Sequence, residues 1–158
     1  MSVKTPTSVR RQPAGVERGS MSKVRAVLLL TIDVPFDERA VGFAVDTAVE
    51  TSAQLFVCDA VPIRVANPAV AVSRTLGEKR TRREADRIVR QARARGARAS
   101  QLVFHNPNPI RAVIEVIKQE NIGLLVFGPD RAELGNRRFL SNARRLREGA
   151  ACLVWTNE

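Results

Sequence analysis

Short, unbroken apolar runs alternate along this sequence with longer amphipathic stretches, and this alternation restricts the possible fold more than any other feature. Five runs have the length of a β-strand: Val24–Ile32, Gln54–Cys58, Ser100–Phe104, Leu124–Phe127 and Ala151–Trp155. A run without polar alternation fits a strand that is covered on both faces by helices. Because strands that alternate with helices form parallel sheets with right-handed crossovers, we predict an α/β domain of three layers, with helices on both faces of a five-stranded parallel sheet.

The segments between these runs carry helix start signals. Asn108 and Pro109 are the residue types preferred at the N-cap and at the first helical position. The segment 61–74 holds two prolines and is expected to be a loop, and the capping-box spacing from Thr75 to Glu78 then starts a long helix. Four helices are therefore expected to begin at Asp37, Thr75, Asn108 and Arg138.

The N-terminal residues differ in composition from the rest of the sequence. Residues 1–22 mix Ser, Thr, Pro, Gly and Arg without apolar periodicity, so we predict a disordered basic tail there and one domain over residues 23–158. Met21 offers an alternative start of translation. The sequence lacks the apolar segment of a signal peptide, and its apolar runs are far shorter than the roughly 20 residues of a membrane span. We therefore expect a cytoplasmic protein without membrane contact.

Motifs for catalysis or metal binding are missing from the sequence. It contains neither GxxxxGK[ST] nor GxGxxG. The single histidine, His105, has no Ser or Cys partner in a motif and no carboxylate to orient it. Cys58 and Cys152 each lie inside an apolar run, which predicts two buried, reduced thiols rather than a disulfide or a metal site. We therefore expect no catalytic residue and no metal.

Candidate ligand-binding residues follow the predicted strands. In parallel α/β sheets, ligands bind beyond the carboxyl ends of the strands, where the strand order reverses. Asp33, His105 and Gly128 occupy such positions. Asp33 could accept hydrogen bonds from a ligand or act as a turn residue, and Gly128 could admit a ligand close to the backbone or simply turn the chain. A phosphoreceiver domain is excluded, because no aspartate follows the third strand.

A strongly basic helix is predicted over residues 79–98, which hold nine basic and two acidic residues. Helical geometry places five basic residues opposite the apolar face: Lys79, Arg80, Arg83, Arg87 and Arg90. One interpretation is an ordinary solvated face. The other is a surface for nucleic acid or another polyanion, in keeping with the net charge of +10. Aromatic residues that could stack on single-stranded bases are absent from this segment.

Three stretches share their order and spacing with the motifs of a known family: Val27–Asp33 with Glu38-Arg39-Ala40, Asn108–Glu115 with Ile122–Gly128, and Ser141–Ala143 with Cys152–Val154. They correspond to an opening strand with its aspartate, a helix leading into a strand that ends in glycine, and a closing helix and strand. From Val24 to Trp155 the sequence thereby resembles the universal stress protein family. The resemblance implies a flavodoxin-like or adenine nucleotide alpha hydrolase-like fold.

The resemblance also implies a nucleotide site. ATP-binding members of that family carry Gly, two residues, Gly, nine residues, and then Gly-Ser or Gly-Thr after the fourth strand. Gly128 matches the first glycine, Arg131 replaces the second, and Ser141-Asn142 stand in place of the final pair. Asp33 matches the aspartate on the adenine side. These five residues are the expected site for ATP or another adenine nucleotide, in which Arg131 would either obstruct or bind phosphate.

The resemblance further implies a non-enzymatic regulatory module of the stress response. It would act through a protein partner that the sequence does not identify, and it would form a homodimer through the last strand, Ala151–Trp155. Weak nucleotide hydrolysis is the enzymatic alternative, for which no residue that positions water is evident.

Overall fold

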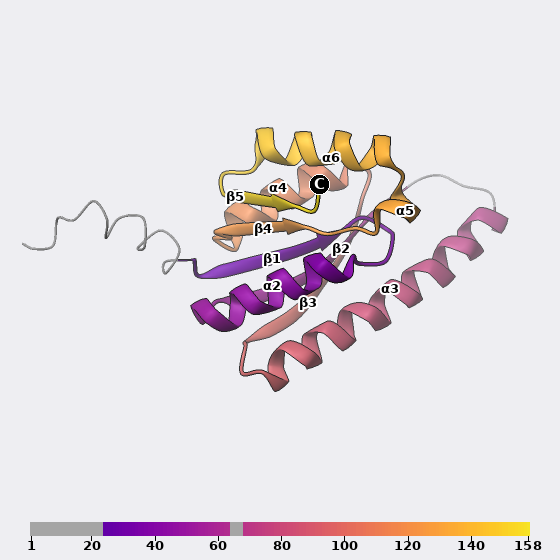
Figure 1. Ribbon diagram of the computed structural model, residues 1–158. Coiled ribbons are helices and arrows are strands. Elements are labelled where there is room, and N and C mark those ends of the chain that lie inside the picture. The colour runs from indigo at the N-terminus through magenta and orange to yellow at the C-terminus, as the bar shows by residue number, and fades with distance from the viewer. Residues whose placement is uncertain (1–23, 64–67) are drawn as a thin grey trace, which may run out of the picture.

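The computed structural model describes residues 24–63 and 68–158 (Figure 1). The predicted tail over residues 1–22, with Met21, lies outside the described residues. The elements in chain order are β1 (Ala26–Thr31), α2 (Glu38–Thr51), β2 (Gln54–Pro62), α3 (Pro68–Ala94), β3 (Ala99–Asn106), α4 (Pro109–Gln119), β4 (Leu124–Phe127), α5 (Arg131–Leu134), α6 (Asn136–Gly149) and β5 (Leu153–Thr156). No helix of this described part of the chain is long and apolar enough to cross a membrane.

The five strands form one parallel sheet, as predicted, and their order in it is β3-β2-β1-β4-β5. The chain reaches β3 at one edge and then crosses to β4 on the other side of β1, where Val27 pairs with Leu124 and Leu30 with Phe127. The strand order therefore reverses between β1 and β4. Flavodoxin has the order 2-1-3-4-5, so the likeness to it concerns the layers and not the strand order.

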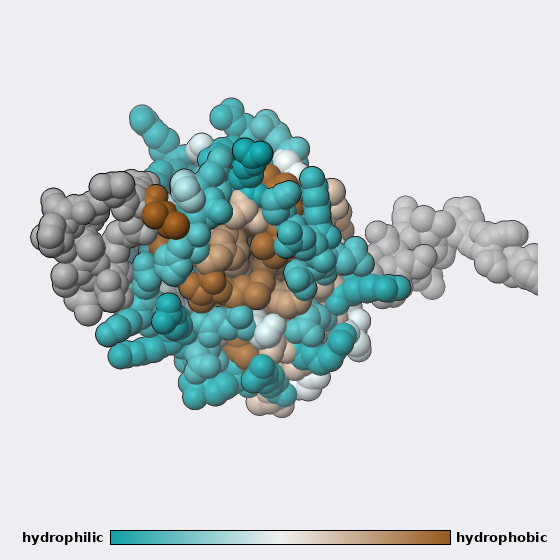
Figure 2. Space-filling model, turned by 180° about the vertical axis from the view of Figure 1, so that it is seen from behind, coloured by the Kyte–Doolittle hydropathy of each residue, from teal (hydrophilic) through white to brown (hydrophobic). Residues whose placement is uncertain are grey.

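The helices divide between the two faces of the sheet, and each pair encloses its own core (Figure 1). Helices α2 and α3 cover one face through buried side chains such as Ala44 and Ile88. Helices α4 and α6 cover the other through Val113 and Leu146. Every residue of β1 is buried between the two layers, which explains why its sequence is an unbroken apolar run. On the face turned away in Figure 1, apolar side chains gather near the middle, with hydrophilic ones around them (Figure 2).

Several boundaries differ from the predicted ones. Helix α3 begins at Pro68 and not at Thr75. Proline at the first helical position costs no hydrogen bond, so the second proline of the expected loop starts a helix instead of preventing one. Strand β2 continues to Pro62, where it pairs with Asn106. The segment 64–67 of the expected loop lies outside the described residues.

The last third of the chain also shows changes in detail. The segment after β4 contains the short helix α5, and α6 begins at Asn136 rather than at Arg138. Strand β5 starts at Leu153 and not at Ala151, because the Leu153 N–H is the first to bond across to the residue before β4, at the Gly123 carbonyl (3.3 Å). The predicted helix starts at Asp37 and Asn108 are confirmed, since each side chain accepts a hydrogen bond from a first-turn N–H.

Gly128, which follows β4, is buried at the point where β1, β4 and α2 meet. Its N–H donates to the Leu30 carbonyl and its carbonyl accepts from the Asp37 N–H, both at 2.8 Å. A Cβ added to Gly128 would overlap the Cβ of Ala40 and lie 3.2 Å from Cδ1 of Leu29. The absence of a side chain thus allows α2 to approach the end of β4.

We expect Gly128→Ala to lower the free energy of unfolding by about 1–3 kcal/mol, because the added methyl group overpacks the contact with Ala40. Gly42→Ala is the matched control. Gly42 lies in α2 two residues after Ala40, and nothing lies within 4 Å of its added Cβ. Removal of a glycine from a helix interior raises stability by about 0.5–1 kcal/mol. Denaturant unfolding of both variants measures this, and equal effects of the two changes would contradict the role assigned to Gly128.

Candidate functional site

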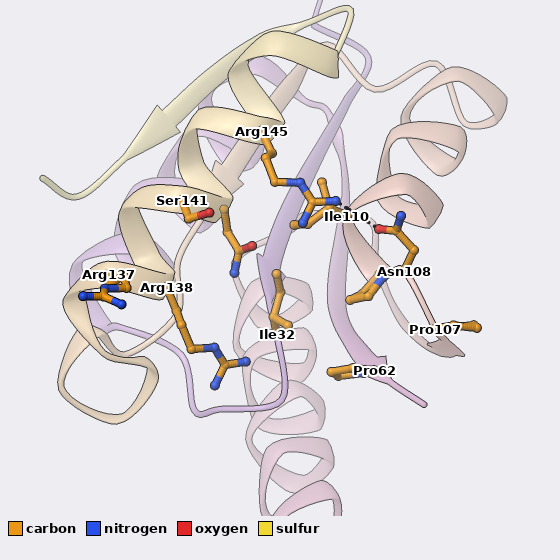
Figure 3. A pocket seen from close by; sticks show the side chains of 11 residues that line it. Ile32, Pro62, Pro107, Asn108, Ile110, Arg137, Arg138, Ser141 and Arg145 are labelled. Carbon is orange, nitrogen blue, oxygen red and sulfur yellow. Dashed lines mark hydrogen bonds between the residues drawn. The ribbon is translucent and has the colours of Figure 1, made fainter. Parts of the chain in front are cut away.

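A cavity of about 480 Å³ opens at the carboxyl ends of the strands, between the first turns of α4 and α6 (Figure 3). Such a position beside the reversal of strand order is where α/β sheets bind ligands. The cavity is lined by Ile32, Pro62, Pro107, Asn108, Pro109, Ile110, Arg137, Arg138, Ser141, Asn142 and Arg145.

Helix α6 presents two different stripes. Phe139, Ala143 and Leu146 are buried in the core. Four other residues line the cavity at the spacing i, i+3, i+4 and i+7, which places them on one face of a helix: Arg138, Ser141, Asn142 and Arg145. We call these four residues the α6 polar stripe. Arg137 also lines the cavity, but its side chain points away from Asn108 and Pro62 in Figure 3.

Asn108 connects the two helices that border the cavity. Its Oδ1 accepts from the backbone N–H of Arg111 at 3.3 Å, which caps α4. The same oxygen accepts from the Arg145 guanidinium at 3.2 Å (Figure 3). A guanidinium has five N–H donors, so Arg145 is held in place by one bond and keeps further donors for a ligand.

The electrostatics of the cavity favour anions. Of the described residues that line it, three are arginines and none carries a carboxylate. Within the described part of the chain, Arg138 and Arg145 form no salt bridge, whereas Arg147 on the same helix pairs with Glu158. The first turn of a helix adds positive potential, and both α4 and α6 begin here. The arrangement can therefore bind a negatively charged group.

Two of the five predicted site residues, Ser141 and Asn142, line this cavity. The structure places the other three elsewhere. Gly128 is buried, and both its backbone groups are engaged by Leu30 and Asp37. The Arg131 guanidinium lies over the Phe139 ring at 4.3 Å, donates to the Asn157 carbonyl at 3.3 Å, and also donates to Oδ1 of Asn136. It is thus directed toward the C-terminal residues and not into the cavity.

Asp33 lies directly beyond β1, in the left-handed backbone region with φ of +59°. Its N–H donates to Oδ1 of Asp59 at 2.9 Å. Asp59 belongs to β2 and shares the α2–α3 face with Val57, since side chains two apart on a strand point the same way. The cavity, by contrast, contacts the face that Ile32 occupies. Asp33 and the cavity therefore both lie at the carboxyl ends of the strands, but Asp33 does not line the cavity.

Sequence reasoning missed Asp59, a nearly fully buried carboxyl group. Burial is the main cause that raises its pKa to about 7, and the charges of Asp33 and Glu78 raise it further, while the bond from the Asp33 N–H and the charge of His105 oppose the shift. The signal was a charged residue inside an apolar segment, Leu55–Val61. Its contact with the Asp33 N–H follows only from the register of β1 and β2, which pairs Asp59 with Thr31 and so brings Asp33 close to it.

His105 was expected beyond the end of the third strand and without a carboxylate to orient it, and both expectations are wrong. It lies within β3, and its Nε2 is 3.2 Å from Oε2 of Glu78 on α3. This carboxylate gives the His105 ring an orienting partner. Groups of three or more residues that could hold a metal are absent from the described part of the chain.

The two cysteines are free, which agrees with the prediction of reduced thiols, but the predicted burial is confirmed for Cys58 and wrong for Cys152. Cys58 is fully buried, and burial raises the pKa of its thiol well above the usual range. Cys152 is only half-buried, because it directly precedes β5, which lies at the edge of the sheet.

The basic face predicted on residues 79–98 is exposed on α3, while Ala85 and Ile88 on the opposite side are buried. Several of its charges have acidic partners. Arg80 pairs with Glu133, Arg87 with Glu84 and Arg90 with Asp86. This pairing reduces the positive field that a polyanion would meet, so the cavity is the stronger candidate for anion binding.

The pKa of Asp59 predicts a dependence of stability on pH. A carboxyl group whose folded-state pKa lies above its unfolded-state pKa stabilises the fold while protonated, and this contribution is lost as pH rises. The Asp59 contribution should therefore decline between about pH 4 and pH 7. Asp59→Asn keeps an oxygen for the Asp33 N–H and cannot ionise, so the stability advantage of this variant over the wild type should grow across that range. Urea unfolding at several pH values tests this; a constant difference would show that Asp59 titrates normally.

Comparison with known proteins identifies the family. The sequence profile of the universal stress protein family matches residues 24–156. Comparison with curated proteins found no match. Among solved structures, a universal stress protein family protein from Burkholderia pseudomallei is 19% identical, with 88% of this chain and 98% of that chain covered and a TM-score of 0.64.

Two further solved structures share the fold. The universal stress protein from Archaeoglobus fulgidus in complex with dAMP is 18% identical, over 85% of this chain and 98% of that chain, with a TM-score of 0.62. A family protein from Arabidopsis thaliana with AMP bound is 14% identical, over 84% of this chain and 90% of that chain, with a TM-score of 0.57. With the profile match over nearly the whole described fold, this chain belongs to the universal stress protein family.

Proposed function

We propose that this chain is a non-enzymatic regulatory module of the cytoplasmic stress response that binds an adenine nucleotide in the cavity between α4 and α6. The observation that carries the proposal is the cavity itself, which lies at the reversal of strand order and offers cations and polar donors without a carboxylate. In such an environment the phosphate of a nucleotide meets no like charge.

The structures of two family members support the choice of an adenine nucleotide. The Archaeoglobus fulgidus protein is in complex with dAMP, and the Arabidopsis thaliana protein has AMP bound. In this chain Ser141 and Asn142 are the predicted residues that line the cavity, and they supply a hydroxyl and an amide. Asp33, Gly128 and Arg131 remain candidates through the family motif alone, because the cavity does not include them.

The chemistry of the cavity supports binding without turnover. None of the described residues that line it is a histidine, cysteine, aspartate or glutamate. Removal of a proton from an attacking water needs a base of this kind within hydrogen-bond reach. We therefore propose that the bound nucleotide acts as a signal, which the module passes to a partner protein.

We further propose a homodimer formed through the last strand. In the described part of the chain, strand β5 pairs only with β4, so its other edge carries no neighbouring strand. Leu153, at its start, is a large apolar residue with 54% of its surface exposed. A second β5 edge would pair the backbone groups of this edge and cover Leu153.

Nucleotide binding is tested by calorimetry with ATP, ADP and AMP. Ser141→Ala combined with Asn142→Leu removes the hydroxyl and the amide from the cavity. We expect affinity for these nucleotides to fall roughly thirtyfold, at about 1 kcal/mol for the hydrogen bond of each side chain. Gln101→Ala, on the far strand β3, is the control and should bind like the wild type. No binding by the wild type at millimolar concentrations would remove the proposed ligand.

The dimer is tested by light scattering after size exclusion. Leu153→Glu would place a charge in the proposed interface, so this variant should elute as a monomer, whereas the wild type should elute as a dimer. Ile63→Glu is the matched control, because Ile63 is also an exposed apolar residue, with 50% of its surface accessible, but lies beyond the end of β2. A monomeric wild type, or equal effects of the two variants, would contradict the interface.

A further inference from the structure

We infer that the cavity contains a subsite for a chain of phosphate groups, formed by Arg138 and Arg145 of the α6 polar stripe. This inference rests on the proposed function, since it specifies which part of the nucleotide the cavity holds. It assigns the phosphate contacts to arginines of α6 rather than to the loop that begins at Gly128.

The spacing of the two arginines supports a ligand with more than one anionic group. Arg145 follows Arg138 by seven positions, which corresponds to about 10 Å along a helix axis. Ser141 and Asn142 lie between them on the same face. Figure 3 shows both arginine side chains extending from α6, with the Arg145 guanidinium bonded to Asn108. A linear polyphosphate can contact both guanidinium groups and the donors between them, whereas one phosphate can contact only part of this row.

The state of the guanidinium groups supports an anion rather than a structural role. In the described part of the chain, neither Arg138 nor Arg145 has a carboxylate partner, and no carboxylate lines the cavity. Directly after α3, by contrast, the exposed Arg95 is paired with Asp46 at 2.7 Å. The bond from Arg145 to Asn108 involves a neutral oxygen, so it orients the guanidinium and leaves its charge uncompensated.

The backbone adds to the same potential. Helix α6 begins after Gly135 with no side chain that caps its first N–H groups, and Arg137 and Arg138 of its first turn line the cavity. The first turn of α4 lines the opposite side through Pro109 and Ile110. Two helix N-termini and two guanidinium groups without a carboxylate partner therefore converge on one space, and each favours negative charge there.

The experiment measures binding of adenosine, AMP, ATP and sodium tripolyphosphate by calorimetry at one fixed ionic strength. We expect ATP and tripolyphosphate to bind more tightly than AMP, and adenosine to bind most weakly. Arg138→Gln and Arg145→Gln each remove a charge and leave a shorter, neutral polar side chain. Each should weaken ATP and tripolyphosphate by about tenfold or more, and adenosine little.

Arg144→Gln is the matched control, because it removes the same charge from the same helix at an exposed position outside the cavity lining. It should bind ATP as the wild type does. Thermal unfolding of all three variants confirms that each remains folded. If Arg144→Gln weakens tripolyphosphate as strongly as the other two, the attraction belongs to the overall charge of the protein and the subsite is wrong.

The outcomes separate this inference from the proposed function. Binding of ATP and adenosine with equal affinity, unaffected by Arg138→Gln and Arg145→Gln, would overturn the phosphate subsite and leave nucleotide binding intact. Binding of tripolyphosphate and ATP with equal affinity, lost in both variants, would support the subsite and contradict recognition of adenine. Binding of none of the four probes would contradict both.

Discussion

The pairing of β1 with β4 is the contact on which the position of every candidate site residue depends. It places β4 on the far side of β1 from β2 and β3. The chain leaves β3 and β4 at the carboxyl ends of these strands, on the two sides of β1. Helices α4 and α6 therefore begin near each other, with the cavity between them. Gly128 holds this junction together through its bonds to Leu30 and Asp37 and through the space it leaves for Ala40.

At the carboxyl ends of the strands, acidic and basic side chains lie on opposite faces of the sheet. On the α2–α3 side, Asp59 lies near Asp33, and the Glu84 carboxylate accepts the Phe36 N–H at 2.9 Å. On the α4–α6 side, the cavity holds arginines and neutral polar groups. The buried β1 strand lies between these two regions, so an anion in the cavity is kept apart from the carboxylates. This separation gives a strongly basic protein a localised anion site in addition to its general positive field.

Much of the fold could be predicted from the sequence, because strands buried on both faces leave a plain apolar signal. The apolar run Leu124–Phe127 predicts a strand with the observed bounds, and the caps at Asp37 and Asn108 follow from local side-chain chemistry. The start of α3 was missed because proline signals both a loop and a first helical turn. Only the packing of the helix on the sheet decides between these two signals, and a local sequence pattern does not contain it.

Only part of the candidate site could be predicted from the sequence. Ser141 and Asn142, which the resemblance to the family motif implied, line the cavity. Arg131 does not line it. The direction of the Arg131 side chain is set by its contact with the Phe139 ring and by its bond to Asn157, which is distant in sequence, and a local sequence pattern shows neither contact. An amide NMR titration of the full chain with ATP tests most directly whether the cavity between α4 and α6 binds the ligand. We predict saturable shifts confined to residues 108–111 and 136–145; shifts along residues 79–98 instead, or none, would contradict a ligand site in this cavity.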